Sequence, residues 1–331
     1  KICNNFTMYF NKKNDFYHGI MLHHFHDRKQ HIKSQGSINA SQFEKLLKLI
    51  GQENFLTPEE FMHKCLNKTI KKKELCLTFD DSLKCQLDIA LPVMKKLNLK
   101  SFFFISSSIL TSKPDNLELY RYFRHKYFKK IDIFYENFFN TLRDAKTKID
   151  LEGFFKKEKK TIHYFKIKHP MYSKNDILLR LVRDRLLNKK QYDKIMYRMF
   201  EDKKFNYKKQ LKSLYLNKED IKKIDKSGHM IGLHSHTHPN MMEKLNYQKQ
   251  FREYNLNKIF LENLLDKKIL SMSHPCGSYN LKTLNILKKI GIKIGFKQIM
   301  QKDRNMKKIN NSLYEIARAN HSQIIKNHNI N

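Results

Sequence analysis

The chain has 331 residues, of which 40% are hydrophobic and 12% aromatic, a composition that excludes a disordered polypeptide. The length suffices for one large domain or two ordinary ones. The formal charge of +34 suggests three classes of anionic partner: nucleic acid, anionic lipid and acidic glycan. Because the lysines are spread along the whole length, without a finger spacing, a phosphate loop or an aromatic-glycine RNA motif, we expect no nucleic acid partner.

The cysteines and the apolar segments indicate the cellular compartment of the protein. Five cysteines, an odd number without a Cys-x-x-Cys pair, argue against a disulfide framework and favour a reducing compartment. No segment approaches the roughly 18 apolar residues of a membrane span. Polar residues at 11–15 interrupt the only apolar run near the N-terminus, so no signal peptide is expected. We therefore expect a cytoplasmic protein and leave open a peripheral contact with an anionic membrane.

Strand-like and helix-like segments alternate along the chain. An apolar run at 19–25 ends in histidines, and 41–50 repeats apolar residues at helical spacing behind a serine cap. The further predicted strands are 74–79, 101–106, 230–233, 269–272, 292–296 and 313–317, and the further predicted helices are 83–97, 247–265 and 281–290. Strands and helices in this alternation predict a parallel sheet, open or closed into a barrel.

A long interruption at 111–211 divides this pattern. It is rich in Lys, Tyr and Phe, and its segment 176–187 has helical periodicity. A loop of this length without structure of its own would be improbable in a compact domain. We therefore expect residues 1–110 and 212–331 to form the two parts of one barrel, with 111–211 as a mainly helical insertion. A separate small domain is the alternative.

Two adjacent carboxylates, Asp80 and Asp81, follow the strand at 74–79. In a parallel alternating fold, catalytic groups collect at the carboxyl ends of strands. Adjacent residues that leave a strand point in different directions, so one carboxylate can bind a metal while the other faces the attacking water. The alternative is a helix cap or a solvated turn.

The strand at 230–233 is followed by His234-Ser-His-Thr-His238. His234 and His238 on one helical turn would face the same way, which His236 would not. Two neutral imidazoles and one carboxylate suit Zn and its neighbours in the first transition row, and they leave positions open for water and substrate. The alternative is a polar histidine-rich loop. Together with the carboxylate pair, this pattern indicates a mononuclear metal site in a hydrolase.

These segments resemble the motifs of the polysaccharide deacetylases, the NodB-homology group also called carbohydrate esterase family 4. Thr78 to Asp81 resembles the first motif, Gly228 to His238 the second, and His274 to Asn280 the third. Met21 to His24 is similar to the aromatic-His segment that opens many members with an N-terminal extension. The resemblance implies an α/β fold, a distorted (β/α) barrel of the NodB-homology type, with the mainly helical insertion between the first and second motifs.

The resemblance also implies a set of metal ligands and a base. Asp81, His234 and His238 would hold a divalent metal ion, for which we expect Zn. Asp80 would be the general base that takes a proton from the attacking water. The metal would lower the pKa of water towards about 7 and polarise the acyl oxygen.

Further roles follow from the same resemblance. His24 would be the general acid that protonates the departing amine, with His23, His26 and His321 as competitors. The backbone near Tyr279, with Pro275 beside it, would line the acyl and oxyanion site. Arg318 is similar to an arginine near the end of many members and would orient Asp80.

The sequence departs from the family pattern at three points. Ser82 stands where the family has glycine, so the turn must accept a side chain. His274 stands where an aromatic residue or arginine is usual. The chain contains no Trp, a residue that often lines the sugar groove, so the insertion is expected to supply substrate contacts through Tyr and Phe.

The function expected from these observations is the metal-dependent removal of an acetyl group from an N-acetylated sugar. The substrate would be a polysaccharide or a glycan precursor for cell-surface polysaccharide biosynthesis. One alternative is an amidohydrolase that acts on a small non-sugar amide. Another is a catalytically inactive binding protein for an anionic polymer, which is disfavoured because Asp80, Asp81, His234 and His238 are all present.

Overall fold

The structure is a computed structural model that describes residues 15–111, 116–145, 149–168, 172–299 and 308–329. Contacts divide the chain into two units, one made of residues 1–115 and 214–331 and the other of residues 116–213. Each unit is described by itself.

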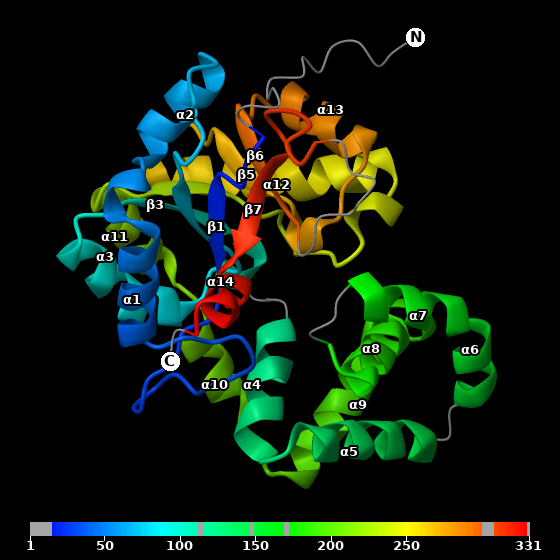
Figure 1. The fold of residues 1–331 in the computed structure, drawn as a ribbon. Coiled ribbons are helices and arrows are strands. Elements are labelled where there is room, and N and C mark those ends of the chain that lie inside the picture. The colour runs from blue at the N-terminus through cyan, green and yellow to red at the C-terminus, as the bar shows by residue number, and fades with distance from the viewer. Residues whose placement is uncertain (1–14, 112–115, 146–148, 169–171, 300–307, 330–331) are drawn as a thin grey trace. The chain divides into compact units, whose positions relative to one another are not determined.

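The first unit is a closed barrel of parallel strands with helices around it (Figure 1). The strands, which pair in chain order, are β1 (Gly19–Leu22), β2 (Cys76–Phe79), β3 (Ser101–Ile105), β4 (Met230–Leu233), β5 (Ser271–Ser273), β6 (Ile294–Gln298) and β7 (Ile316–Asn320). The pairing of β1 with β7, with Gly19 opposite Arg318, closes the ring. The predicted parallel α/β sheet is thus confirmed in its barrel form.

Helices cover the barrel between the strands. They are α1 (Ala40–Ile50), α2 (Pro58–Leu66), α3 (Leu91–Lys96), α11 (Lys218–Lys226), α12 (Tyr247–Leu265), α13 (Leu281–Lys289) and α14 (His321–Asn327). The cap of α1 is Asn39 and not the predicted serine, because Asn39 accepts the backbone N–H of Gln42 while the Gln42 side chain accepts that of Asn39. A π-helical turn at 86–90 precedes α3, since Pro92 cannot donate a helical hydrogen bond.

Aromatic rings pack together with aliphatic side chains in the barrel core. Phe61, Phe102, Phe104 and Phe296 are all buried, and they contact one another with ring centroids 5.2 to 6.1 Å apart. The guanidinium of Arg318 lies over two of these rings, 5.8 Å from Phe104 and 6.0 Å from Phe296. The hydrophobic layer therefore supports a buried cation inside the barrel.

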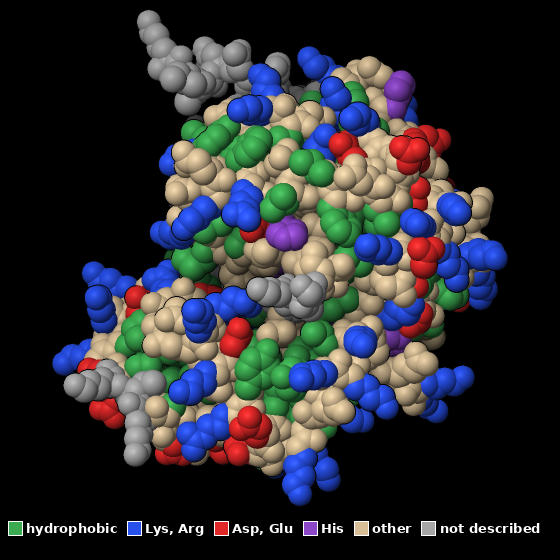
Figure 2. All heavy atoms as spheres, turned by 180° about the vertical axis from the view of Figure 1, so that it is seen from behind, with side chains coloured by type: hydrophobic (Ala, Val, Ile, Leu, Met, Phe, Trp, Pro, Cys, Tyr) green, Lys and Arg blue, Asp and Glu red, His purple; other side chains and the backbone are tan. Residues whose placement is uncertain are grey.

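In its described residues, the second unit consists of helices and the turns that connect them. Its helices are α4 (Leu117–Tyr127), α5 (Ile131–Asp144), α6 (Leu151–Lys157), α7 (Lys159–Lys168), α8 (Lys174–Leu181), α9 (Lys189–Asp202) and α10 (Tyr207–Leu214). Phe123, Phe134, Phe138 and Phe200 are fully buried at its centre. In the described part of the chain, no helix is long and apolar enough to cross a bilayer. Figure 2 shows Lys and Arg side chains spread over one face of the molecule, without a single dense patch.

Candidate active site

The carboxylate pair follows β2 in a strained turn. Asp81 and Ser82 both have positive φ, 72° and 58°, a backbone region that costs a residue with a side chain about 1 kcal/mol. The Ser82 hydroxyl accepts the backbone N–H of Ser106 at 3.0 Å, and the Ser82 carbonyl accepts that of Leu216 at 2.9 Å. Serine thus occupies the position where the family has glycine, and hydrogen bonds hold it there.

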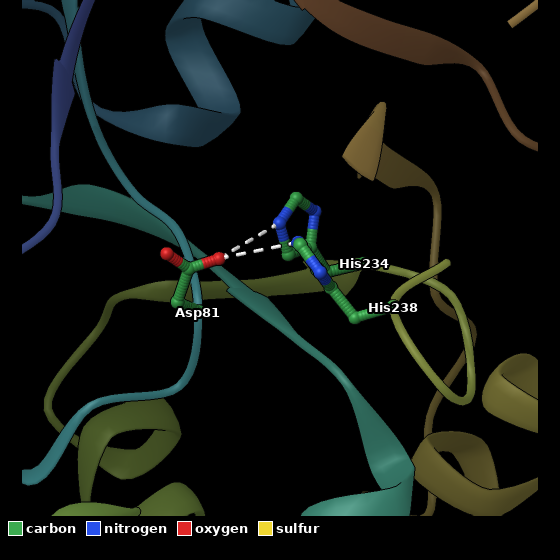
Figure 3. A group of neighbouring side chains, drawn as sticks. All are labelled: Asp81, His234 and His238. Carbon is green, nitrogen blue, oxygen red and sulfur yellow. Dashed lines mark ion pairs between the residues drawn. The ribbon is translucent and has the colours of Figure 1, made fainter. Parts of the chain in front are cut away.

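Asp81, His234 and His238 converge on one point, as Figure 3 shows. One Asp81 carboxylate oxygen lies 3.3 Å from Nε2 of His234 and 3.4 Å from Nε2 of His238. Two ligand atoms that each lie about 2.1 Å from a tetrahedral metal are about 3.4 Å apart. The donor set and its spacing therefore fit a divalent metal ion.

Hydrogen bonds orient the first of these imidazoles. Nδ1 of His234 lies 3.0 Å from the carbonyl oxygen of Ser273. Because a carbonyl only accepts, Nδ1 carries the proton and the lone pair of Nε2 faces Asp81. The backbone N–H of His234 donates to the side-chain oxygen of Asn257 on α12. His234 is therefore fixed in the tautomer that a metal ligand needs.

The residues between the two histidines have other contacts. Nδ1 of His236 lies 2.9 Å from the Ser107 hydroxyl, so this imidazole is engaged away from the converging group. Ser235 and His238 have positive φ, 62° and 53°, and the Ser235 hydroxyl accepts the backbone N–H of His238. This strained turn brings His238 back beside His234, with ring centroids 4.7 Å apart.

Asp80 is held by Arg318 in a bidentate pair. Both guanidinium nitrogens donate to the carboxylate, each at 2.7 Å, and Asp80 and Arg318 are 2% and 1% exposed. Arg318 also donates to the hydroxyls of Thr78 and Ser273, and Ser273 donates to Asp80 at 3.3 Å. The expected contact between Arg318 and Asp80 is present, and two hydroxyls complete it.

Both carboxylates are ionised at neutral pH. Burial by itself raises the pKa of Asp80, but the charges of Arg318, His234 and His23 outweigh it and leave that pKa below its ordinary value. Burial acts in the same direction on Asp81, yet His23 and the bonded imidazoles lower the pKa of Asp81 further still. Buried Asp80 and half-buried Asp81 are thus both anions.

Two neighbouring histidines, His23 and His24, follow β1. Nε2 of His23 is 3.8 Å from a carboxylate oxygen of Asp80 and 3.8 Å from one of Asp81. The ring of His24 is parallel to that of His23, with centroids 6.2 Å apart. His23 thus contacts both carboxylates.

The other two competitors for the acid role have structural contacts. Nδ1 of His26 lies 2.9 Å from the Ser37 hydroxyl. The two ring nitrogens of His321 lie 3.0 and 2.9 Å from the carbonyl oxygens of Met21 and Gly36. Both imidazoles therefore tie loops of the barrel together.

Gln86, which the sequence did not single out, joins two parts of the site. Its side-chain amide donates to the carbonyl oxygen of Asp80 at 2.6 Å and to that of His23 at 3.0 Å. A fully buried glutamine six residues after Asp80 has no sequence pattern of its own. Only the closeness of the two loops reveals its role.

The third motif forms a tight turn after β5. Pro275 is buried, and Tyr279 stacks on His274 with ring centroids 4.2 Å apart. The Tyr279 hydroxyl donates to Glu315 at 2.9 Å, and Nε2 of His274 lies 2.9 Å from the Tyr314 carbonyl oxygen. Burial lowers the pKa of His274 to about 3, so this imidazole is neutral. The unusual histidine therefore packs as an aromatic ring.

Comparisons with known proteins agree with this architecture. The polysaccharide deacetylase family model matches residues 187–295, which include the second and third motifs but not the carboxylate pair. A search of curated proteins found no significant match.

Solved structures of similar fold span almost the whole chain. The Streptococcus pyogenes deacetylase PplD in complex with acetate is 16% identical, with 93% of this chain and 96% of that chain covered and a TM-score of 0.52. IcaB from Ammonifex degensii is 13% identical, with 92% and 91% covered and a TM-score of 0.51. The de-N-acetylase from Aggregatibacter actinomycetemcomitans is 13% identical, with 94% and 98% covered and a TM-score of 0.51.

At these identities the likeness to solved structures shows the fold. Residues 187–295, which carry the second and third motifs, are similar to the polysaccharide deacetylase family.

Proposed function

We propose that the protein removes an acetyl group from an N-acetylated sugar of a polysaccharide or glycan precursor in a metal-dependent reaction. The observation that carries this proposal is the convergence of Asp81, His234 and His238 next to Asp80. A ligand triad beside a separately held carboxylate is the arrangement that hydrolysis of an amide needs.

Asp81, His234 and His238 would hold the metal, for which Zn is our choice. When bound, the metal supplies Lewis acidity, which lowers the pKa of water and polarises a carbonyl oxygen. Asp80 accepts the proton of the attacking water. The bidentate contact with Arg318 fixes the direction of the Asp80 carboxylate and keeps it ionised.

The departing amine needs a proton, and we assign that step to His23. Its Nε2 lies 3.8 Å from both carboxylates, whereas His24, the residue that the family resemblance indicated, is one position further from the strand. The turn from Pro275 to Tyr279 would bound the acetyl group and contribute backbone donors to the oxyanion.

The proposal is tested by metal content and by acetate release from short N-acetylglucosamine oligomers. We expect His238→Ala to lose both metal and activity. We expect Asp80→Asn to keep the metal and lose at least about a hundredfold in kcat, because a general base is removed. His236→Ala is the matched control, since its imidazole contacts Ser107, and it should keep both.

Two results would count against the proposal. Full activity of Asp80→Asn would remove that residue as base, and unchanged metal content in His238→Ala would remove the ligand set. Release of acetate from simple acetamides but not from sugar oligomers would favour a small-amide hydrolase. A metal-loaded protein that acts on neither substrate class would favour an inactive binding protein.

We also propose that the helical unit makes peripheral contact with an anionic membrane. Residues 116–213 contain 27 Lys and Arg against 12 Asp and Glu, a formal charge of +15. On α7, Tyr164 and Ile167 are 55% and 63% exposed, among exposed lysines. Basic and apolar side chains on one helix suit the surface of a charged bilayer.

A further inference from the structure

Three consecutive serines, Ser106 to Ser108, follow β3, and all three are buried. The Ser106 hydroxyl donates to the carbonyl oxygen of His234 at 2.9 Å. The Ser107 hydroxyl lies 2.9 Å from Nδ1 of His236, and the backbone N–H of Ser108 donates to the His236 carbonyl oxygen at 2.9 Å. The serine run is therefore hydrogen-bonded along the histidine segment that follows β4.

Ser106 also contacts the turn that carries the other type of ligand. Its backbone N–H donates to the Ser82 hydroxyl at 3.0 Å, and Ser82 is the residue after Asp81. Asp81 follows β2 and His234 follows β4, and Figure 3 shows the two side chains facing each other from separate loops. Because β3 pairs with both β2 and β4, Ser106 at its end has one hydrogen bond to each ligand-bearing turn.

The bond from Ser106 completes the fixation of His234. The His234 backbone N–H donates to the side-chain oxygen of Asn257 at 3.0 Å, and the Asn257 amide donates to the carbonyl oxygen of Ile105, the residue before Ser106, at 3.0 Å. Nδ1 of His234 is held by the Ser273 carbonyl. The backbone N–H, the carbonyl and Nδ1 of this ligand are thus all bonded to other elements of the barrel, two of them at the end of β3.

The Asp81 turn depends on hydrogen bonds to keep its conformation. Asp81 and Ser82 both have positive φ, which disfavours residues with a side chain. The fully buried Ser82 hydroxyl ties this turn to β3 through Ser106, while the Ser82 carbonyl ties it to Leu216. The hydroxyl bond is therefore the contact that couples the position of the turn to the strand beside His234.

We propose that Ser82 and Ser106 form a serine brace that sets the separation of Asp81 from His234 and thereby raises the affinity of the site for its metal. This inference rests on the proposed function, in which Asp81 and His234 are ligands. Both serines are positioning residues, because they act through the ligands. Hydrogen bonds behind metal ligands change metal affinity by about ten- to a hundredfold, since ligands that are already in place need no ordering when the metal binds.

The test measures the dissociation constant of Zn²⁺ by competition with a chromophoric chelator. Ser106→Ala removes the bond to His234, and Ser82→Ala removes the bond to the Asp81 turn, so each should raise the dissociation constant about tenfold. The two bonds act in series, and breaking either one disconnects the turns. The double variant should therefore also raise the dissociation constant about tenfold, and not about a hundredfold.

Two further variants separate the brace from general effects on the fold. Ser107→Ala is the matched control, because it removes a buried hydroxyl of the same run whose partner is His236, and it should leave the Zn²⁺ affinity unchanged. Ser82→Gly relieves the positive φ but also lacks the hydroxyl, so it should weaken Zn²⁺ binding as much as Ser82→Ala. The visible spectrum of Co²⁺ bound in place of Zn²⁺ responds to ligand geometry, and it should shift in Ser106→Ala but not in Ser107→Ala.

Unchanged Zn²⁺ affinity in Ser82→Ala or in Ser106→Ala would overturn the serine brace while leaving the deacetylase proposal intact. Additive losses in the double variant, or an equal loss in Ser107→Ala, would overturn it as well, because the serines would then act separately or through the fold. None of these measurements needs catalysis, so they test the brace even if no acetate is released. A wild-type protein that bound no Zn²⁺ would overturn the ligand set and the brace together.

Discussion

His23 and His24 leave the same strand, and their neighbouring rings are candidates for one proton transfer. We expect His23→Gln to lower kcat about a hundredfold without loss of metal, because its Nε2 lies 3.8 Å from both carboxylates. His24→Gln should change kcat only slightly. Acetate release measured with metal content tests this directly, and a larger loss in His24→Gln would return the acid role to that residue.

The sequence predicted which residues make up the site, but not which hydrogen-bond partners they have. Asp80, Asp81, His234 and His238 come from two short motifs, and the structure brings them together. The choice between His23 and His24 depends on the direction in which one loop leaves the barrel, which no spacing encodes. The roles of Gln86 and the Ser273 hydroxyl arise only when distant loops meet.

At the scale of elements, each of the seven predicted strands is present, although several ends are shifted. The predicted strand at 313–317 begins later, since a turn with a hydrogen bond from Glu315 to Ser312 precedes it. Closure of the barrel requires Gly19 beside Arg318, and a Cβ at Gly19 would lie 2.5 Å from the Arg318 side chain. The alternation of strands and helices predicts where the strands lie. It does not predict that Gly19 lies opposite Arg318, because that contact forms only when β1 pairs with β7.

The starts of β3 and β4 are joined by a neutral histidine, which makes stability depend on pH. Nδ1 of His229 accepts from the backbone N–H and the hydroxyl of Ser101. Burial, reinforced by Lys100, lowers the pKa of His229 to about 4. In the unfolded chain that pKa is about 6.5. Between the two values the unfolded state binds more protons, so stability falls as the pH is lowered through this range.

We expect this histidine to account for up to about 3 kcal/mol of the loss in unfolding free energy between neutral pH and pH of about 4. His229→Gln should be less stable than wild type at neutral pH, and the difference should shrink on acidification. Urea unfolding at a series of pH values measures it, with His163→Gln, on the exposed side of α7, as control. Parallel pH curves for wild type and His229→Gln would contradict the assignment.

At the scale of the molecule, charge is distributed unevenly between the two units. The helical unit carries +15 over 98 residues, whereas the other 233 residues carry +19. The sequence predicted a helical segment at 111–211, and the structure groups residues 116–213. Composition could not show which of its side chains are exposed, because Tyr and Phe serve equally well in a core.

On α7, Lys160, Tyr164 and Ile167 share one exposed face. We expect the double variant Tyr164→Ser, Ile167→Ser to weaken binding to phosphatidylserine vesicles about tenfold. It removes two apolar side chains that would be partly buried in the bilayer. Leu281→Ser is the matched control, because Leu281 is 62% exposed on the barrel unit.

Vesicle sedimentation at low and high salt separates the two contributions to this binding. Salt weakens the part that depends on lysine and leaves the apolar part. Acetate release from soluble oligomers should be the same in both variants, because α7 supplies no residue of the metal site. If Leu281→Ser weakened sedimentation as much as the α7 variant, or if wild type did not sediment at low salt, the helical unit would not be the membrane-binding part. Its charge would then be a general property of this lysine-rich chain.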